Sequence, residues 1–140
     1  AYYKNRQLTQ EARTWREDFL LQLQQPKVLQ QIQSIKQAWN STEHALCVSY
    51  DFFYPYNLLL TKKGEVSKRS MDLTNIEKLV QDNLFEHRYN GREIDGIVIE
   101  NFDIDDKFIV SLQSRKLAHN LPHHEILITV QLCSLELLRL

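Results

Sequence analysis

Apolar residues recur at helical spacing through the first forty residues, and this pattern predicts two consecutive helices. The first helix begins after Thr9, a candidate N-cap, and Pro26 separates it from the second. The predicted apolar faces consist of Ala12, Trp15, Phe19 and Leu23 in the first helix and of Val28, Leu29, Ile32 and Ile35 in the second.

Three later segments alternate apolar and polar residues with a period of two, which is typical of strands that bury one face. They run from Leu46 to Tyr54, where Pro55 ends the strand, from Phe108 to about Lys116, and from Ile126 to Cys133. We expect residues 58–60 to extend or cover the sheet. The predicted buried face consists of Leu46, Val48, Tyr50, Phe52, Phe108, Val110, Leu112, Ile126, Ile128, Val130 and Leu132.

A third predicted helix follows a polar loop and runs from about Asp72 to about Tyr89, where Asn90-Gly91 marks a turn. Its apolar face consists of Ile76, Leu79, Val80, Asn83 and Leu84, and its polar face of Asn75, Lys78 and Asp82. The order helix, strand, helix, strand, strand predicts an α+β fold with a mixed or antiparallel sheet. At 140 residues, we expect one domain over 1–140.

The start of this third helix has a purely structural interpretation as well. Thr74 and Glu77 have the spacing of a capping box, or Asp72 is itself the cap. Lys78 and Asp82 form an i,i+4 pair worth only about 0.2–0.5 kcal/mol.

Composition argues against a protein that binds nucleic acid through bulk charge, because the formal net charge is −1. The charge is uneven, however, and the loop over residues 61–69 holds four cations, Lys62, Lys63, Lys68 and Arg69. Near the start, Tyr2 and Tyr3 alternate with cations, a pattern found both where bases stack and at packed edges.

Cys47 and Cys133 each lie in an apolar, strand-like run without metal-ligand spacing. We expect two buried free thiols in a reducing compartment, and the sequence gives no support for a disulfide.

No apolar run approaches eighteen residues, so we expect a cytoplasmic protein without a membrane span. The histidines at 119, 123 and 124 are expected to be solvated, with a transition-metal site as the alternative.

Carboxylates form two groups, Asp72 at the start of the third helix and the acidic stretch of Asp103, Asp105 and Asp106 before a strand. Separated carboxylates of this kind are a common way to hold Mg²⁺, which prefers oxygen ligands and keeps several waters. In phosphodiester cleavage such an ion polarises the phosphate, and a lysine offsets charge in the transition state. Basic loops nearby would hold the nucleic-acid backbone.

Several of these residues occur in the order and spacing of one family. They are Asp72-Leu73-Thr74-Asn75, Lys78, Asp82-Asn83-Leu84, and Asp105-Asp106 before Phe108-Ile109-Val110. Tyr2-Tyr3-Lys4 at the start and Lys116 at the end of the following strand also fit. In these motifs the chain resembles the RusA-type Holliday-junction resolvases, small dimeric Mg²⁺-dependent endonucleases.

The resemblance implies a RusA-like nuclease domain that resolves four-way DNA junctions in recombination and repair. It implies Asp72, Lys78 and Asp106 as catalytic residues, and Asp72, Asp105 and Asp106 as ligands of Mg²⁺, for which Mn²⁺ would substitute. It further implies a homodimer on branched DNA. The expected DNA contacts are Lys4, Arg6, Lys62, Lys63, Lys68, Arg69, Asn75 and Lys116.

One departure from the family pattern bears directly on catalysis. The second Asp of the D-x-D-N motif is Thr74 here, so a neutral hydroxyl replaces a full charge. The family's first strand, before the Tyr-Tyr stretch, is also without a match. Two alternatives therefore stand beside the nuclease: a non-catalytic relative that binds branched DNA or a protein, and an unrelated α+β scaffold whose acidic residues serve as caps and turns.

Overall fold

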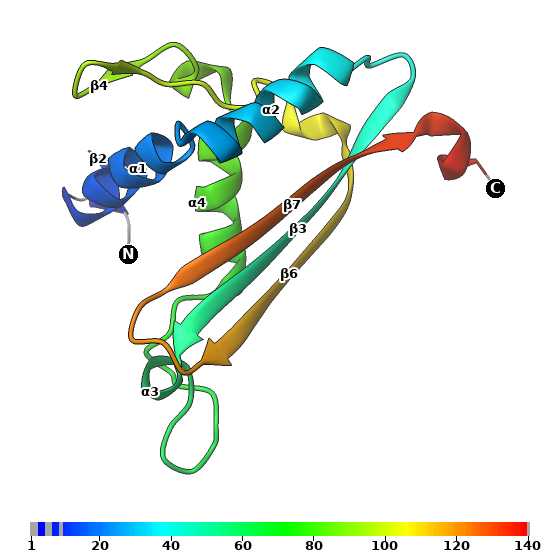
Figure 1. The fold of residues 1–140 in the computed structure, drawn as a ribbon. Coiled ribbons are helices and arrows are strands. Elements are labelled where there is room, and N and C mark those ends of the chain that lie inside the picture. Colours follow the sequence, from blue (N-terminus) through cyan, green and yellow to red (C-terminus); the bar gives the residue numbers. More distant parts are fainter. Residues whose placement is uncertain (1–2, 5–6, 9, 140) are drawn as a thin grey trace. The chain divides into compact units, whose positions relative to one another are not determined.

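The fold was obtained as a computed structural model, which describes residues 3–4, 7–8 and 10–139, with side chains over 10–139 (Figure 1). The chain divides into two compact units, and the boundary between them falls within the third long helix. Unit 1 consists of Ala1–Trp39 with Gln81–Asp106, and unit 2 of Asn40–Val80 with Lys107–Leu140.

Unit 1 begins with the short antiparallel strands β1 (Tyr3–Lys4) and β2 (Gln7–Leu8), followed by helices α1 (Gln10–Gln22) and α2 (Pro26–Ala38). Both predicted helices are confirmed, with Pro26 in the first turn of α2, where its missing N–H costs nothing. The predicted cap Thr9 lies outside the described residues. The buried residues of the two helices are Ala12, Phe19, Leu20, Leu23 and Ile32.

Helix α4 (Leu73–Phe85) enters unit 1 with its last turn and ends four residues earlier than expected. A 3-10 helix, η1 (His87–Tyr89), occupies the remainder. Next comes a hairpin of β4 (Glu93–Ile94) and β5 (Ile97–Val98). Its two turn residues, Asp95 and Gly96, have φ of 51° and 79°, as a two-residue turn of the favoured hand requires.

Unit 2 is built on a three-stranded sheet in which the central strand is β3 (His44–Pro55) (Figure 1). Strand β6 (Ile109–His119) pairs with it in parallel, and β7 (Glu125–Ser134) pairs with it antiparallel. The predicted α+β class and mixed sheet are confirmed. All three predicted strands exist. Strands β3 and β7 extend slightly beyond both expected ends, whereas β6 begins one residue later and ends three residues later than expected.

One face of the central strand β3 is buried, as the alternation predicts. Leu46, Val48, Tyr50 and Phe52 are each at most 3% exposed, and the predicted inward residues of β7 lie directly opposite them. The predicted burial of Val110 and Leu112 on β6 is wrong, because these side chains are 47% and 39% exposed. Val110 is the extra residue of an irregularity in the pairing, since Leu46 lies opposite Ile109 and Cys47 opposite Ser111. Further along, β6 places Ser114 and Lys116 beside Tyr50 and Phe52. Phe108 lies outside the strand, in the 3-10 helix η2 (Asp106–Phe108).

Two short helices complete unit 2. Helix α3 (Tyr56–Leu59) follows β3 directly, so the segment expected to extend or cover the sheet is mostly helical, with Leu59 buried. The 3-10 helix η3 (Leu135–Leu138) follows β7, and Leu137 in it is 79% exposed.

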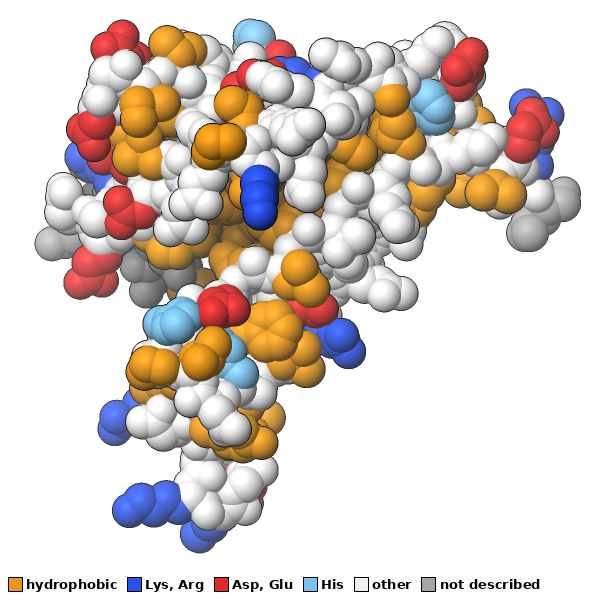
Figure 2. Space-filling view, in the orientation of Figure 1, with side chains coloured by type: hydrophobic (Ala, Val, Ile, Leu, Met, Phe, Trp, Pro, Cys, Tyr) orange, Lys and Arg blue, Asp and Glu red, His pale blue; other side chains and the backbone are white. Residues whose placement is uncertain are grey.

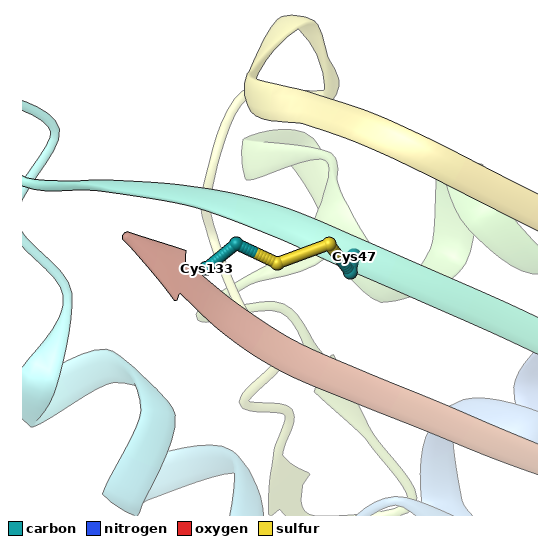
Figure 3. The surroundings of a disulfide bond; sticks show 2 residues. All are labelled: Cys47 and Cys133. Carbon is teal, nitrogen blue, oxygen red and sulfur yellow. A yellow bond between two sulfur atoms is a disulfide. The ribbon is translucent and has the colours of Figure 1, made fainter. Parts of the chain in front are cut away.

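The prediction of two free thiols is wrong, because Cys47 and Cys133 form a disulfide (Figure 3). In the antiparallel register of β3 and β7, Cys133 lies opposite Ala45, two residues from Cys47. Side chains two residues apart point to the same face of a sheet, so both cysteines lie on the less buried face, with Cα atoms 6.4 Å apart. The sequence alone could not reveal this register.

Within residues 3–4, 7–8 and 10–139, no helix is long and apolar enough to cross a membrane.

Candidate functional site

Unit 1 contains a pocket of about 530 Å³ at the end of α4, and most of its lining is charged. Four of the lining side chains are carboxylates, and two others are cationic or can become so. We call it the acidic pocket; its lining consists of Gln81, Phe85, Glu86, His87, Arg88, Asp103, Asp105 and Asp106.

The acidic segment reaches this pocket because its apolar residues anchor it. Phe102 and Ile104 are 6% and 5% exposed, and the ring of Phe102 stacks on Phe85 with centroids 5.1 Å apart. The residues that alternate with them, Asp103 and Asp105, are exposed. Because buried and exposed positions alternate in this short segment, the carboxylates of Asp103 and Asp105 are exposed and line the pocket.

Asn101 fixes this segment to the C-terminal end of α4. Its side chain is fully buried, and its Nδ2 donates hydrogen bonds to the carbonyls of Asn83 and Glu86, at 3.0 and 2.9 Å. The backbone N–H of Phe102 donates to the carbonyl of Leu84 at 2.9 Å. These bonds satisfy carbonyls that the end of a helix leaves without intrahelical partners, which explains why α4 ends at Phe85.

Asp103 occupies a backbone conformation that non-glycine residues seldom adopt, with φ of 49°. The Oδ1 of Asn101 accepts a hydrogen bond from the N–H of Asp103 at 2.9 Å, which supports this turn. The carboxylate of Asp103 in turn lies 2.9 Å from Nδ1 of His87.

Two side chains relieve part of the repulsion between the carboxylates. His87 contacts Asp103, and Arg88 forms an ion pair with Glu86. Burial by itself would lower the pKa of Arg88, but Tyr89 and Glu86 outweigh it and hold that pKa above its usual value. Four carboxylates against one arginine and one histidine leave the pocket negative, so it favours cations.

The start of α4, in unit 2, presents three of the predicted residues to solvent: Asp72, Asn75 and Lys78 are exposed. Asp72 directly precedes the helix, and its carbonyl accepts hydrogen bonds from the N–H groups of Asn75 and Ile76. The carboxylate of Glu77 accepts a hydrogen bond from the hydroxyl of Ser114 on β6. Glu77 therefore bonds to Ser114 and does not form the predicted capping box with Thr74.

Residues 60–70, which we call the basic loop, connect α3 to α4 and contain four of the predicted DNA contacts. Its tip is closed by hydrogen bonds from the N–H of Thr61 to the carbonyl of Glu65 and from that of Gly64 to the carbonyl of Thr61. Gly64 has φ of 80°, which a residue with a side chain would adopt only with strain. The predicted contacts, all exposed, are Lys62, Lys63, Lys68 and Arg69.

Figure 2 shows Lys and Arg side chains gathered at the end of this loop, which is the lowest part of Figure 1. Lys116 on β6 joins the second half of the loop, because its Nζ donates to Oγ of Ser70 at 3.1 Å. Its ammonium also lies 5.8 Å from the ring centroid of Tyr54. The hydrogen bond thus ties Lys116 to Ser70, the residue that follows Arg69 in the basic loop.

The structure thus groups the predicted residues within each unit. Asp105 and Asp106 share the acidic pocket, and Lys116 adjoins the basic loop. Asp72 and Lys78 belong to unit 2, whereas the acidic pocket belongs to unit 1, so their approach to a common metal stays a prediction. The predicted contacts Lys4 and Arg6 lie outside the residues whose side chains are described.

The donors of the acidic pocket fit Mg²⁺ chemically, since they are mainly carboxylate oxygens. Among the described residues, no three His, Cys, Asp or Glu side chains come together in a way that would hold a metal. Mg²⁺ is often bound by one or two carboxylates together with waters and a substrate phosphate, so the adjacent pair Asp105 and Asp106 would suffice as its protein ligands here.

The three histidines at the end of β6 and in the following connection contact neighbouring groups, and Nε2 of His119 lies 2.6 Å from the carbonyl of His123. His119 stacks on Phe53 with centroids 5.6 Å apart, and His124 meets Tyr54 edge to face at 5.0 Å. His123 Nε2 lies 2.8 Å from Glu125. Packing at the end of β3 is the role that these contacts support.

Sequence reasoning missed Glu86 and His87, which line the acidic pocket, and Asn101, which anchors the acidic segment. Glu86 and His87 directly follow the last residue of α4, and a correct helix end would have pointed to them. Asn101 gave no signal, because its role depends on a contact with residues fifteen or more positions away.

The chain matches no protein-family model, no curated protein and no solved structure.

Proposed function

We propose that this protein is a Mg²⁺-dependent, structure-selective DNA endonuclease that resolves four-way junctions. The observation that carries the proposal is the acidic pocket, in which Asp105 and Asp106 lie with Glu86 and Asp103. The order and spacing of Asp72, Asn75, Lys78, Asp105 and Asp106 support it, because they resemble those of the RusA-type resolvases.

In this proposal Asp105 and Asp106 would hold the metal, which would polarise the scissile phosphate and lower the pKa of a bound water. The resemblance to the RusA-type resolvases adds Asp72 as a further proposed ligand. Lys78 would lie close to the phosphate and offset negative charge as it develops. Asn75, one turn from Asp72 on the same helix face, would orient the backbone of the DNA.

The basic loop would hold the DNA. Four exposed cations in one loop would pair with several phosphates of the DNA backbone; they are Lys62, Lys63, Lys68 and Arg69. Lys116 would add a cation whose position is fixed by Ser70.

We further propose that the protein acts as a homodimer. A dimer with two-fold symmetry presents two identical sites, which matches the two symmetric nicks that resolve a junction. A monomer has one active site, and a single cut would leave a nicked junction that is not resolved.

The test is junction cleavage by Asp106→Asn compared with Asp95→Asn. Removal of a carboxylate worth several kcal/mol in metal binding should lower the cleavage rate by about a thousandfold or more and spare junction binding. Asp95→Asn is the matched control, since it makes the same change in the same unit, at a turn where Asn tolerates positive φ. Cleavage by Asp106→Asn at the wild-type rate would show that the site is wrongly assigned.

Thr74 favours a second candidate, a non-catalytic relative that binds branched DNA. Thr74 is exposed beside Asp72, so Thr74→Asp would add the missing carboxylate without disturbing the core. If the wild-type chain binds junctions without cutting and Thr74→Asp restores cutting, the chain is a nuclease that has lost a ligand. If neither cuts, the binding protein is the better description.

A further inference from the structure

Three arginines of unit 1 surround one buried tyrosine, outside all the residues assigned to metal or DNA above. The guanidinium carbons of Arg16, Arg88 and Arg92 lie 5.4, 4.8 and 5.2 Å from the ring centroid of Tyr89. Tyr89 is 5% exposed. We call Arg16, Arg88 and Arg92 the arginine cluster.

The three cations come from three separate segments of unit 1. Arg16 is on α1, Arg88 is in η1, and Arg92 follows η1 just before β4. An aromatic ring has two faces, so at least two of the three guanidinium groups lie over the same face. Like charges at such distances repel, and the fold holds them together only if other interactions offset the repulsion.

The described residues compensate only part of the repulsion between the three arginines. Arg88 pairs with Glu86, but no carboxylate between residues 10 and 139 forms an ion pair with Arg16 or Arg92. The Nε of Arg16 is buried and has no hydrogen-bond partner in that range. The ring of Tyr89 attracts each cation, but it accepts no charge-assisted hydrogen bond in the plane of a guanidinium group.

The cluster is open to a ligand, since Arg88 and Arg92 are exposed and Arg16 is half-buried. Guanidinium groups bind phosphate oxygens through paired N–H donors, and several arginines around one point are typical of phosphate recognition. Fixing the guanidinium groups on a rigid ring lowers the entropy that such binding costs.

We propose that the arginine cluster is a binding site for a phosphate group, either a free phosphorylated ligand or a phosphate of a nucleic-acid backbone. Arg88 also lines the acidic pocket, so a phosphate bound here lies beside that pocket. The site does not depend on the endonuclease proposal, because it requires neither a metal nor cleavage.

The experiment is a calorimetric titration of the protein with inorganic phosphate. The ionic strength is kept constant by lowering the chloride concentration as phosphate is added. Wild-type protein should bind phosphate, and Arg92→Gln should weaken this binding by about tenfold or more, because a charge-assisted hydrogen bond is lost. Lys27→Gln is the matched control, since Lys27 is exposed on α2 in the same unit. Arg92 is exposed, so its replacement should leave the unfolding temperature unchanged.

A second arm identifies the source of the phosphate. A labelled four-way junction is titrated at several salt concentrations, and loss of one backbone contact in Arg92→Gln should reduce the slope of log K against log salt by about one. A changed slope assigns the site to nucleic acid, and an unchanged slope with weakened phosphate binding assigns it to a free phosphorylated ligand. If Arg92→Gln binds both probes as Lys27→Gln does, the cluster serves only to pack Tyr89 and the proposal is wrong.

Discussion

Asn101 is the residue that connects the fold to the acidic pocket. Its side chain makes three hydrogen bonds, two to the carbonyls of Asn83 and Glu86 at the end of α4 and one from the N–H of Asp103, while none of its surface is exposed. The two N–H groups of Nδ2 lie at the negative end of the α4 dipole. Hydrogen-bond donors are favourable there, and an oxygen facing the carbonyls would be unfavourable. A single buried amide therefore sets both the end of the helix and the direction of the carboxylates.

Asn101→Asp should destabilise the protein strongly, although the two side chains have nearly the same shape. The change removes both Nδ2 donors and places a carboxylate against two carbonyls, which should cost about 3 kcal/mol or more in the free energy of unfolding. Urea unfolding at pH 7 measures this. Asn120→Asp, in an exposed loop, is the control and should stay within about 0.5 kcal/mol of wild type. Equal stability of the two variants would refute the role given to Asn101.

Glu100, the neighbouring residue, makes the stability of unit 1 depend on pH. Burial alone would raise its pKa, but hydrogen bonds from Gln33 and Lys36 and the charge of Lys36 outweigh burial and lower that pKa below 4.5. A lowered folded-state pKa stabilises the fold at pH values above the unfolded pKa. This contribution is lost as the pH falls through the folded-state pKa.

Glu100→Gln should therefore unfold with a weaker dependence on pH below about 4.5 than wild type. Near pH 7 it should lose about 1 kcal/mol or less, because the Lys36–Glu100 pair, at 3.0 Å, is partly exposed. Urea unfolding between pH 3 and 7 measures both. If the free energy of unfolding falls equally steeply with decreasing pH in the variant and the wild type, Glu100 has the same pKa in the folded and unfolded chains, and this account of Glu100 is wrong.

At the scale of elements, β3 organises unit 2, and its sequence predicts most of its role. Alternating apolar residues identified its buried face, and Leu46, Val48, Tyr50 and Phe52 are all buried. The order of the sheet could not be predicted in this way. Strands β6 and β7 are consecutive and would ordinarily pair as a hairpin, but β3 lies between them. The connection over residues 120–124 therefore spans two strand spacings, about 10 Å.

The disulfide between β3 and β7 should stabilise this arrangement. It closes a loop of 86 residues in sequence separation, and breaking such a link usually costs about 2–4 kcal/mol. The double variant Cys47→Ala, Cys133→Ala should unfold at correspondingly lower urea concentration than the oxidised wild type. A reductant should destabilise the wild type and have no effect on the double variant. Two titratable thiols in the unfolded, unreduced wild type would contradict the disulfide.

At the scale of the whole molecule, sequence patterns predicted what depends on neighbours along the chain and missed what depends on distant pairing. The amphipathic faces of α1, α2 and α4, the strands and the basic loop all follow from local spacing. The disulfide, the capping by Asn101 and the arginine cluster depend on residues brought together by the fold. The same division applies to the site: Asp105 and Asp106 were identified as neighbours, whereas Glu86 and His87 joined them only in the structure.

The central proposal is that carboxylates of this chain, with Mg²⁺, cut branched DNA. The most direct measurement is cleavage of a labelled synthetic four-way junction by the wild-type protein, with Mg²⁺ and with EDTA, beside a gel shift in EDTA. We expect salt-sensitive binding without metal and paired, symmetric nicks when Mg²⁺ is present. Binding without nicks would contradict catalysis and favour the DNA-binding alternative, and the absence of both would contradict the proposed function altogether.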